Sequence, residues 1–200
     1  MKLLRLSALA IGLILIAQPK IHAQHEIKTN VLGIIITDYN LQYEYVTEDM
    51  GFLMGVSYFN SGSIIGDDSY TTFRLTPEFR YYFNPDEDAS GFFASGYLRY
   101  RNATGEDWYV TSDFDPVTGN TVETSYDLKN TGVAFGFTLG YKWVTRSGLV
   151  FETFGGLGRY LINETSYDPD LPENDPLIDI FDELPQFDVR FGFAIGYRID

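Results

Sequence analysis

The sequence predicts an all-β protein, an eight-stranded antiparallel up-and-down transmembrane β-barrel. Three observations lead to this fold class. Apolar and polar residues alternate with a period of two in eight segments. The less apolar face of those segments mixes charged side chains with very small ones. Short connections also alternate with longer ones along the chain, which is typical of barrels with short turns on one side of a membrane and long loops on the other.

The first 23 residues have the features of a secretory signal peptide. Lys2 and Arg5 precede an apolar run at residues 6–17, and Ala23 provides a small residue at a cleavage site. This run has 12 residues, whereas a membrane-spanning helix needs roughly 20. We therefore expect residues 1–23 to be a signal peptide that is removed, and residues 24–200 to form one outer-membrane barrel domain.

Eight segments are expected to form the strands. The last one is the clearest, because its odd positions are all apolar or aromatic and its even positions are charged or small. Pro77 lies inside one segment, where it removes a ladder hydrogen bond, so we expect a β-bulge there. In chain order the expected strands are residues 27–37, 39–46, 52–60, 73–83, 92–101, 133–143, 149–161 and 187–199.

The connections divide into two classes that alternate along the chain. Compact turns are expected at residues 47–51, 84–90 and 145–148. Between them come a tight turn at 37–38 and longer loops at 61–69, 102–127 and 163–186. With an even number of strands and both termini in the periplasm, all the longer loops lie on the outer side.

Alternation alone does not say which face points outward, since a soluble lipocalin-like barrel also has a period of two with its apolar face inward. The polar face favours a transmembrane barrel, because small residues make room for long charged ones in a narrow lumen. Opposite charges on neighbouring strands can then form ion pairs. Glu78, Arg80, Arg99 and Arg190 are the strongest candidates for this structural network. The full expected set is Arg74, Glu78, Arg80, Arg99, Arg101, Lys142, Glu152, Asp188, Arg190 and Arg198.

Three short motifs carry a resemblance. Residues 27–32 (IKTNVL), 41–45 (LQYEY) and 77–83 (PEFRYYF) resemble small outer-membrane barrel proteins of Bacteroidetes, a family of unknown function. The wider architecture is similar to that of OmpA- and OmpX-type barrels. This resemblance implies an outer-membrane location and assembly from the periplasm, and it implies no known chemistry. The chain departs from the usual pattern at its end, because it closes on Asp200 rather than on an aromatic residue.

Composition excludes several classes of function. Residues 1–23 contain three basic and no acidic residues, so the rest of the chain has 11 basic and 28 acidic side chains and a net charge of −17. Such a charge argues against nucleic-acid binding. With no cysteine, the chain has no disulfide, thiolate metal site, cysteine nucleophile or lipidated cysteine. Residues 113–120 place two aspartates near a glycine but lack the spacing of a calcium loop, so a solvated turn is favoured and no metal or cofactor is expected.

The sequence also predicts that the protein is not an enzyme. The only histidines are His22, in the signal peptide, and His25, ahead of the first strand, so the usual serine or water-activating arrangements lack a base. An acid-only mechanism through Glu44, Glu78 or Glu152 is the alternative, but ion pairing in the lumen is favoured.

The last long loop suggests how the protein meets its surroundings. Residues 163–186 hold eight acidic residues and no basic ones, and residues 176–184 could form a short amphipathic helix. We expect a structural or surface-interaction role, with outer-membrane lipid and lipopolysaccharide as partners and a surface protein as a further partner of the acidic loops. The alternatives are a conduit for small solutes or hydrophobic ligands and a soluble lipocalin-like ligand-binding barrel.

Overall fold

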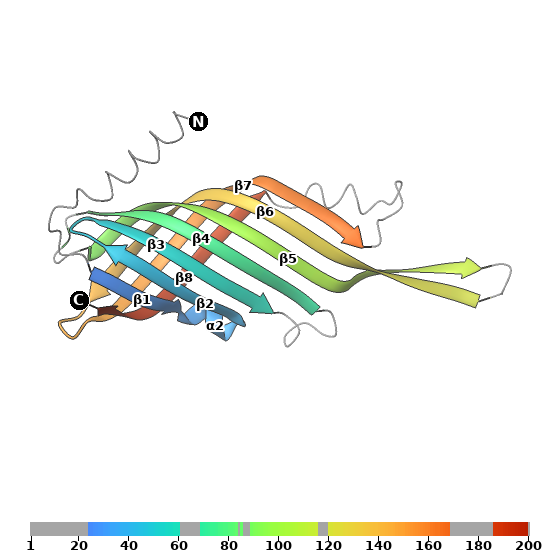
Figure 1. Ribbon diagram of the computed structural model, residues 1–200, viewed down its shortest axis with the longest axis horizontal. Helices are drawn as coiled ribbons and strands as arrows, with labels where there is room; N and C mark the ends of the chain where they lie inside the picture. The colour runs from blue at the N-terminus through green and yellow to red at the C-terminus, as the bar shows by residue number, and fades with distance from the viewer. Residues whose placement is uncertain are drawn as a thin grey trace, which may run out of the picture.

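The computed structural model describes residues 24–60, 69–83, 85, 89–115, 120–168 and 186–199. The expected signal peptide and the expected helix at 176–184 lie outside these residues. Eight antiparallel strands form a closed barrel in which each strand pairs with its neighbours in sequence and β1 pairs with β8 (Figure 1). The strands are β1 (Gln24–Asn30), β2 (Asp38–Val46), β3 (Met50–Asn60), β4 (Ser69–Phe83), β5 (Gly91–Asp115), β6 (Asn120–Val144), β7 (Leu149–Asp168) and β8 (Phe187–Ile199). The predicted all-β fold and its closed, eight-stranded antiparallel up-and-down barrel are confirmed.

The two faces of the strands differ as the alternation predicts. On the outside, Phe137, Val189 and Phe191 are 64%, 64% and 66% exposed, whereas on the inside Arg80 and Lys142 are fully buried. This distribution is the reverse of a lipocalin-like barrel, whose apolar face points inward. Among the described residues, no helix is long and apolar enough to cross a membrane.

The expected loop at residues 102–127 is largely strand, which corrects the prediction. β5 and β6 remain paired as far as Asp115 and Asn120 and form a hairpin that extends beyond the rest of the barrel (Figure 1). Threonine, valine and aromatic residues in this segment favour strands. Both faces of a ribbon outside the barrel wall can face water, so no strict alternation is required and the period-two pattern does not reveal these strands.

The first expected strand is wrong in its second half. β1 ends at Asn30, and a five-residue helix, α2 (Val31–Ile35), follows it. The Asn40 side chain holds this junction, because its Oδ1 accepts from the Asn30 backbone N–H at 2.5 Å and its Nδ2 donates to the Asn30 carbonyl at 3.0 Å. Thr37 then adopts a positive φ of 61° as the chain turns into β2.

The bulge expected at Pro77 is also absent. Pro77 pairs with Met54 of β3 in an unbroken register. Towards β5, pairing is interrupted after Leu75 and resumes at Glu78 in the same register. Proline has no N–H to donate, so ladder hydrogen bonds are lost here, but no extra residue is inserted into the strand. The register shifts occur elsewhere, between Gly105 and Tyr109 and between Val133 and Ala134.

Candidate functional site: a charged lumen and an outer cavity

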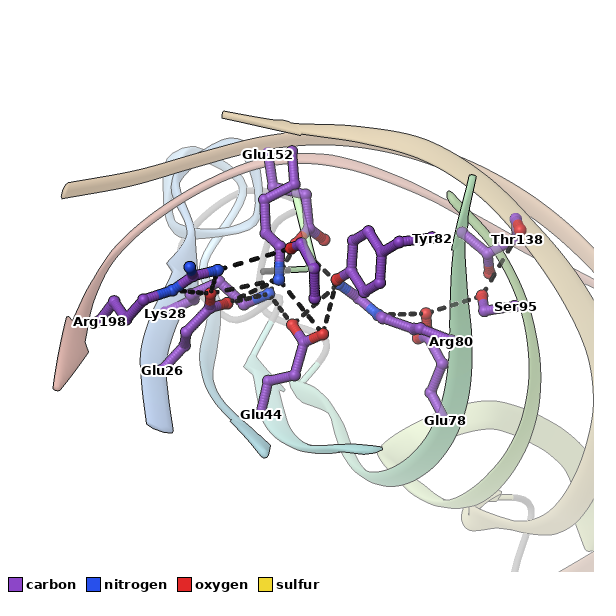
Figure 2. A network of polar contacts seen from close by, with 12 residues as sticks. Glu26, Lys28, Glu44, Glu78, Arg80, Tyr82, Ser95, Thr138, Glu152 and Arg198 are labelled. Carbon is purple, nitrogen blue, oxygen red and sulfur yellow. Dashed lines mark hydrogen bonds and ion pairs between the residues drawn. The ribbon is translucent and has the colours of Figure 1, made fainter. Parts of the chain in front are cut away.

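Buried charges fill the lumen at the end of the barrel where the short turns lie. Glu44 is central to this cluster (Figure 2). Its carboxylate pairs with Lys28, accepts a hydrogen bond from the Tyr82 hydroxyl at 2.6 Å, and lies 3.2 Å from Nη1 of Arg80 and 3.4 Å from Nζ of Lys142. One carboxylate on β2 therefore ties together β1, β4 and β6.

Two further carboxylates complete the cluster. Oε2 of Glu152 accepts from Nζ of Lys28 at 2.6 Å and from Nη1 of Arg80 at 2.7 Å. Glu26 accepts from Nζ of Lys142 at 3.0 Å and from Nη2 of Arg198 at 2.6 Å. Each charge is buried and has at least one oppositely charged partner, which is the condition under which buried ions are tolerated. We name Glu26, Lys28, Glu44, Arg80, Lys142, Glu152 and Arg198 the inner cluster.

Beyond the inner cluster, away from the short turns, two further acids, Glu78 and Asp188, pair with lumen side chains. Glu78 accepts from Nε of Arg80 at 2.8 Å, from Nη1 of Arg190 at 2.6 Å and from the Ser95 hydroxyl at 2.8 Å. Farther from the short turns, Asp188 accepts from Nη1 of Arg99 at 2.8 Å and from the Tyr97 hydroxyl at 2.7 Å. The ion pairs thus continue through most of the length of the barrel.

Nine of the ten residues expected in the lumen form ion pairs. Arg74 lies 3.0 Å from Asp38, and the other eight pair as described above. Arg101 differs, because its Nη2 donates to the amide oxygens of Asn130 and Asn163, at 2.6 and 3.1 Å. Glu26 and Lys28 are not among the lumen residues predicted from the sequence, and Glu44 is predicted only as a possible catalytic acid. All three alternate with apolar residues near strand ends, a signal that could have identified them.

A cavity of about 600 Å³ lies beyond Arg190, in the half of the barrel opposite the short turns. We name it the outer cavity. Apolar side chains such as Leu53 and Phe154 line part of it. The charged residues of the lining are four arginines, Arg74, Arg99, Arg101 and Arg190, and two aspartates, Asp38 and Asp188. In the part of the chain that the structure describes, no group of three or more histidine, cysteine, aspartate or glutamate side chains could hold a metal ion.

Comparisons with known proteins agree with this architecture. The chain is similar to the crystal structure of a major outer membrane protein from Thermus thermophilus, with a TM-score of 0.52 and 14% sequence identity, over 88% of this chain and 99% of that one. At this identity the similarity concerns the fold alone. No curated protein matches the sequence. Residues 8–175 match the family model described as "Protein of unknown function (DUF3575)", and the chain therefore belongs to this family.

Proposed function

We propose that this protein is a non-enzymatic outer-membrane barrel with a structural or surface-interaction role, short periplasmic turns and acidic external loops. One observation carries the proposal: the outer face of the barrel is apolar, and the inner cluster fills its lumen. Such an outer face suits lipid, as in OmpA- and OmpX-type barrels. A lumen filled with side chains leaves little room for an aqueous pore.

The β5–β6 hairpin supports the surface-interaction part of the proposal. Past Glu106 on β5 and Asp127 on β6, the two strands pair only with each other within the described residues. Both edges therefore carry backbone groups that a partner strand can bind. Residues 106–127 contain six acidic and no basic side chains, so a basic partner surface is favoured, together with divalent cations that bridge to lipopolysaccharide phosphates.

Planar-bilayer recordings test the closed lumen against the conduit alternative. The purified barrel, inserted at a density verified by gel, should give no stable stepwise conductance, because the inner cluster blocks the ion path. A large porin inserted in the same bilayers serves as the positive control. Reproducible unitary conductance from the wild-type barrel would contradict the proposal and favour a conduit.

A charge on the outer face should weaken folding into lipid. Phe137→Arg places a cation among outward-facing side chains of β6 and should cost about 2–4 kcal/mol if that face contacts the bilayer core. Urea titration of the barrel in lipid vesicles measures the change, with Phe137→Leu as the matched control of unchanged charge. An arginine tolerated as well as leucine would place this face in water.

A further inference from the structure

The barrel wall is incomplete on the outer side of the β1–β8 junction. β8 begins at Phe187, but its pairing with β1 ends at Ala194, opposite Asn30. The Asn30 side chain extends this pairing slightly, since its Oδ1 accepts from the Phe193 N–H at 3.1 Å and its Nδ2 donates to the Phe191 carbonyl at 3.3 Å. Beyond that point, α2 lies beside β8 in place of a strand (Figure 1).

The outer cavity extends to this incomplete wall. Its lining includes Arg99 and Asp188, which face the lumen, and also Val189 and Phe191, which face outward on β8. Neither Val189 nor Phe191 is in register with a residue of β1, so the cavity reaches an edge of β8 that no strand covers. Ile35, which is 71% exposed, contributes to the same lining from α2. At this edge the cavity is lined by apolar residues of α2 and β8 that face the surroundings of the barrel, whereas the charged side chains of its lining lie inside the lumen.

Within the described residues, the interior holds one cation without a carboxylate partner. Asp38, Asp188 and Glu78 pair with Arg74, Arg99 and Arg190 respectively. In the same part of the chain, Arg101 bonds only to the amide oxygens of Asn130 and Asn163 and stacks 4.3 Å from the centre of the Tyr160 ring. Its Nε is buried and has no partner among the described groups. A partly buried guanidinium favours an anion that balances its charge.

We infer that the outer cavity binds a single-chain amphiphile, with its anionic carboxylate or phosphate headgroup at Arg101 and its acyl chain leaving between α2 and β8. The volume is within the range of small-molecule sites. An acyl chain can enter sideways from the bilayer without crossing the inner cluster, so a closed lumen and ligand binding are compatible. The inference rests on the proposed membrane location, because the apolar edge of the cavity must face lipid.

Photo-crosslinking in dodecyl maltoside micelles tests this placement. Two dodecanoate probes are used, one with a diazirine beside the carboxylate and one with a diazirine at the far end of the chain. Mass spectrometry should locate the first probe on lumen residues around Tyr160 and the second on α2 and the outward face of β8. Equal labelling of the whole outer face by both probes would show ordinary detergent-like contact and overturn the inference.

Variants and competitors identify the headgroup and chain contributions. Arg101→Gln should weaken probe binding about tenfold, the loss expected for one hydrogen bond to a charged group, whereas Arg146→Gln, in the exposed turn after β6, should not. Val189→Trp should obstruct the apolar edge of the cavity, with Leu157→Trp on the outward face of β7 as its control. Dodecyl phosphate should compete and inorganic phosphate should not.

Three outcomes would overturn the inference: unchanged binding to Arg101→Gln, unchanged binding to Val189→Trp, or equal competition by inorganic phosphate, which would indicate a site for free anions. Each variant is first checked for a folded barrel by its gel mobility without boiling. Loss of the folded form of the wild type in micelles, or conductance in bilayers, would instead count against the proposed function.

Discussion

Replacing Glu44 with alanine should destabilise the folded barrel by about 3–5 kcal/mol, the usual cost of removing one partner from a buried ion pair. Glu44 is fully buried, and Lys28, Arg80 and Lys142 all contact its carboxylate. Without it, the inner cluster has two carboxylates, Glu26 and Glu152, for four cations, and the Tyr82 hydroxyl loses its acceptor. Urea unfolding in lipid vesicles, followed by gel mobility, measures the change.

Two matched variants make this result specific. Glu48→Ala removes an exposed carboxylate from the turn between β2 and β3 and should change stability by less than about 0.5 kcal/mol. Glu44→Gln removes the charge but keeps an oxygen near Tyr82, so its effect should lie between the two alanine variants. If Glu44→Ala were as stable as Glu48→Ala, the inner cluster would contribute nothing to closing the barrel.

Gly136→Val should prevent normal closure of the barrel or cost about 3 kcal/mol, the upper end of the usual cost of overpacking. Gly136 of β6 pairs with Gly158 of β7, and the Tyr97 side chain lies over both. A Cβ at Gly136 would lie 2.6 Å from the Gly158 Cα and 2.6 Å from the Tyr97 ring and hydroxyl. Tyr97 cannot move freely, because its hydroxyl donates to Asp188 at 2.7 Å, so overpacking here forces the backbone to shift.

Gly155→Val is the control for this prediction. Gly155 faces outward on β7, and a Cβ there would meet nothing within 4 Å. The same increase in volume and β-propensity should therefore be tolerated. The folded fraction after dilution from urea into vesicles measures both variants. Equal yields of folded barrel for Gly136→Val and Gly155→Val would show that folding does not require the close contact of Tyr97 with Gly136 and Gly158.

The parts of the fold that the sequence predicts are those set by local alternation. In a strand between lipid and a narrow lumen, apolar side chains must alternate with charged or small ones at every residue, so β8 can be predicted from Phe187 to Ile199. The hairpin beyond the barrel lacks this constraint, so the same criterion predicts a loop there. The segment at 31–36 is apolar at nearly every position, and α2 is too short to show a helical period, so the pattern predicts a strand instead.

The charged lumen is predictable as a set of residues but not as pairs. Alternation places Glu78, Arg80 and Arg190 on one face, and burial then requires opposite partners. The pairs themselves join distant positions, such as Lys28 with Glu152, which are 124 residues apart. Only barrel closure brings such residues together. The outer cavity depends on where β1 stops relative to β8, which no residue pattern specifies.

Gel mobility shows whether the protein is a closed barrel in the outer membrane. Membranes are separated into inner and outer fractions, extracted with detergent, and run with and without boiling. We expect an outer-membrane protein that migrates faster unboiled and shifts to the position of the unfolded chain on boiling. A soluble protein with the same mobility in both lanes would contradict this expectation.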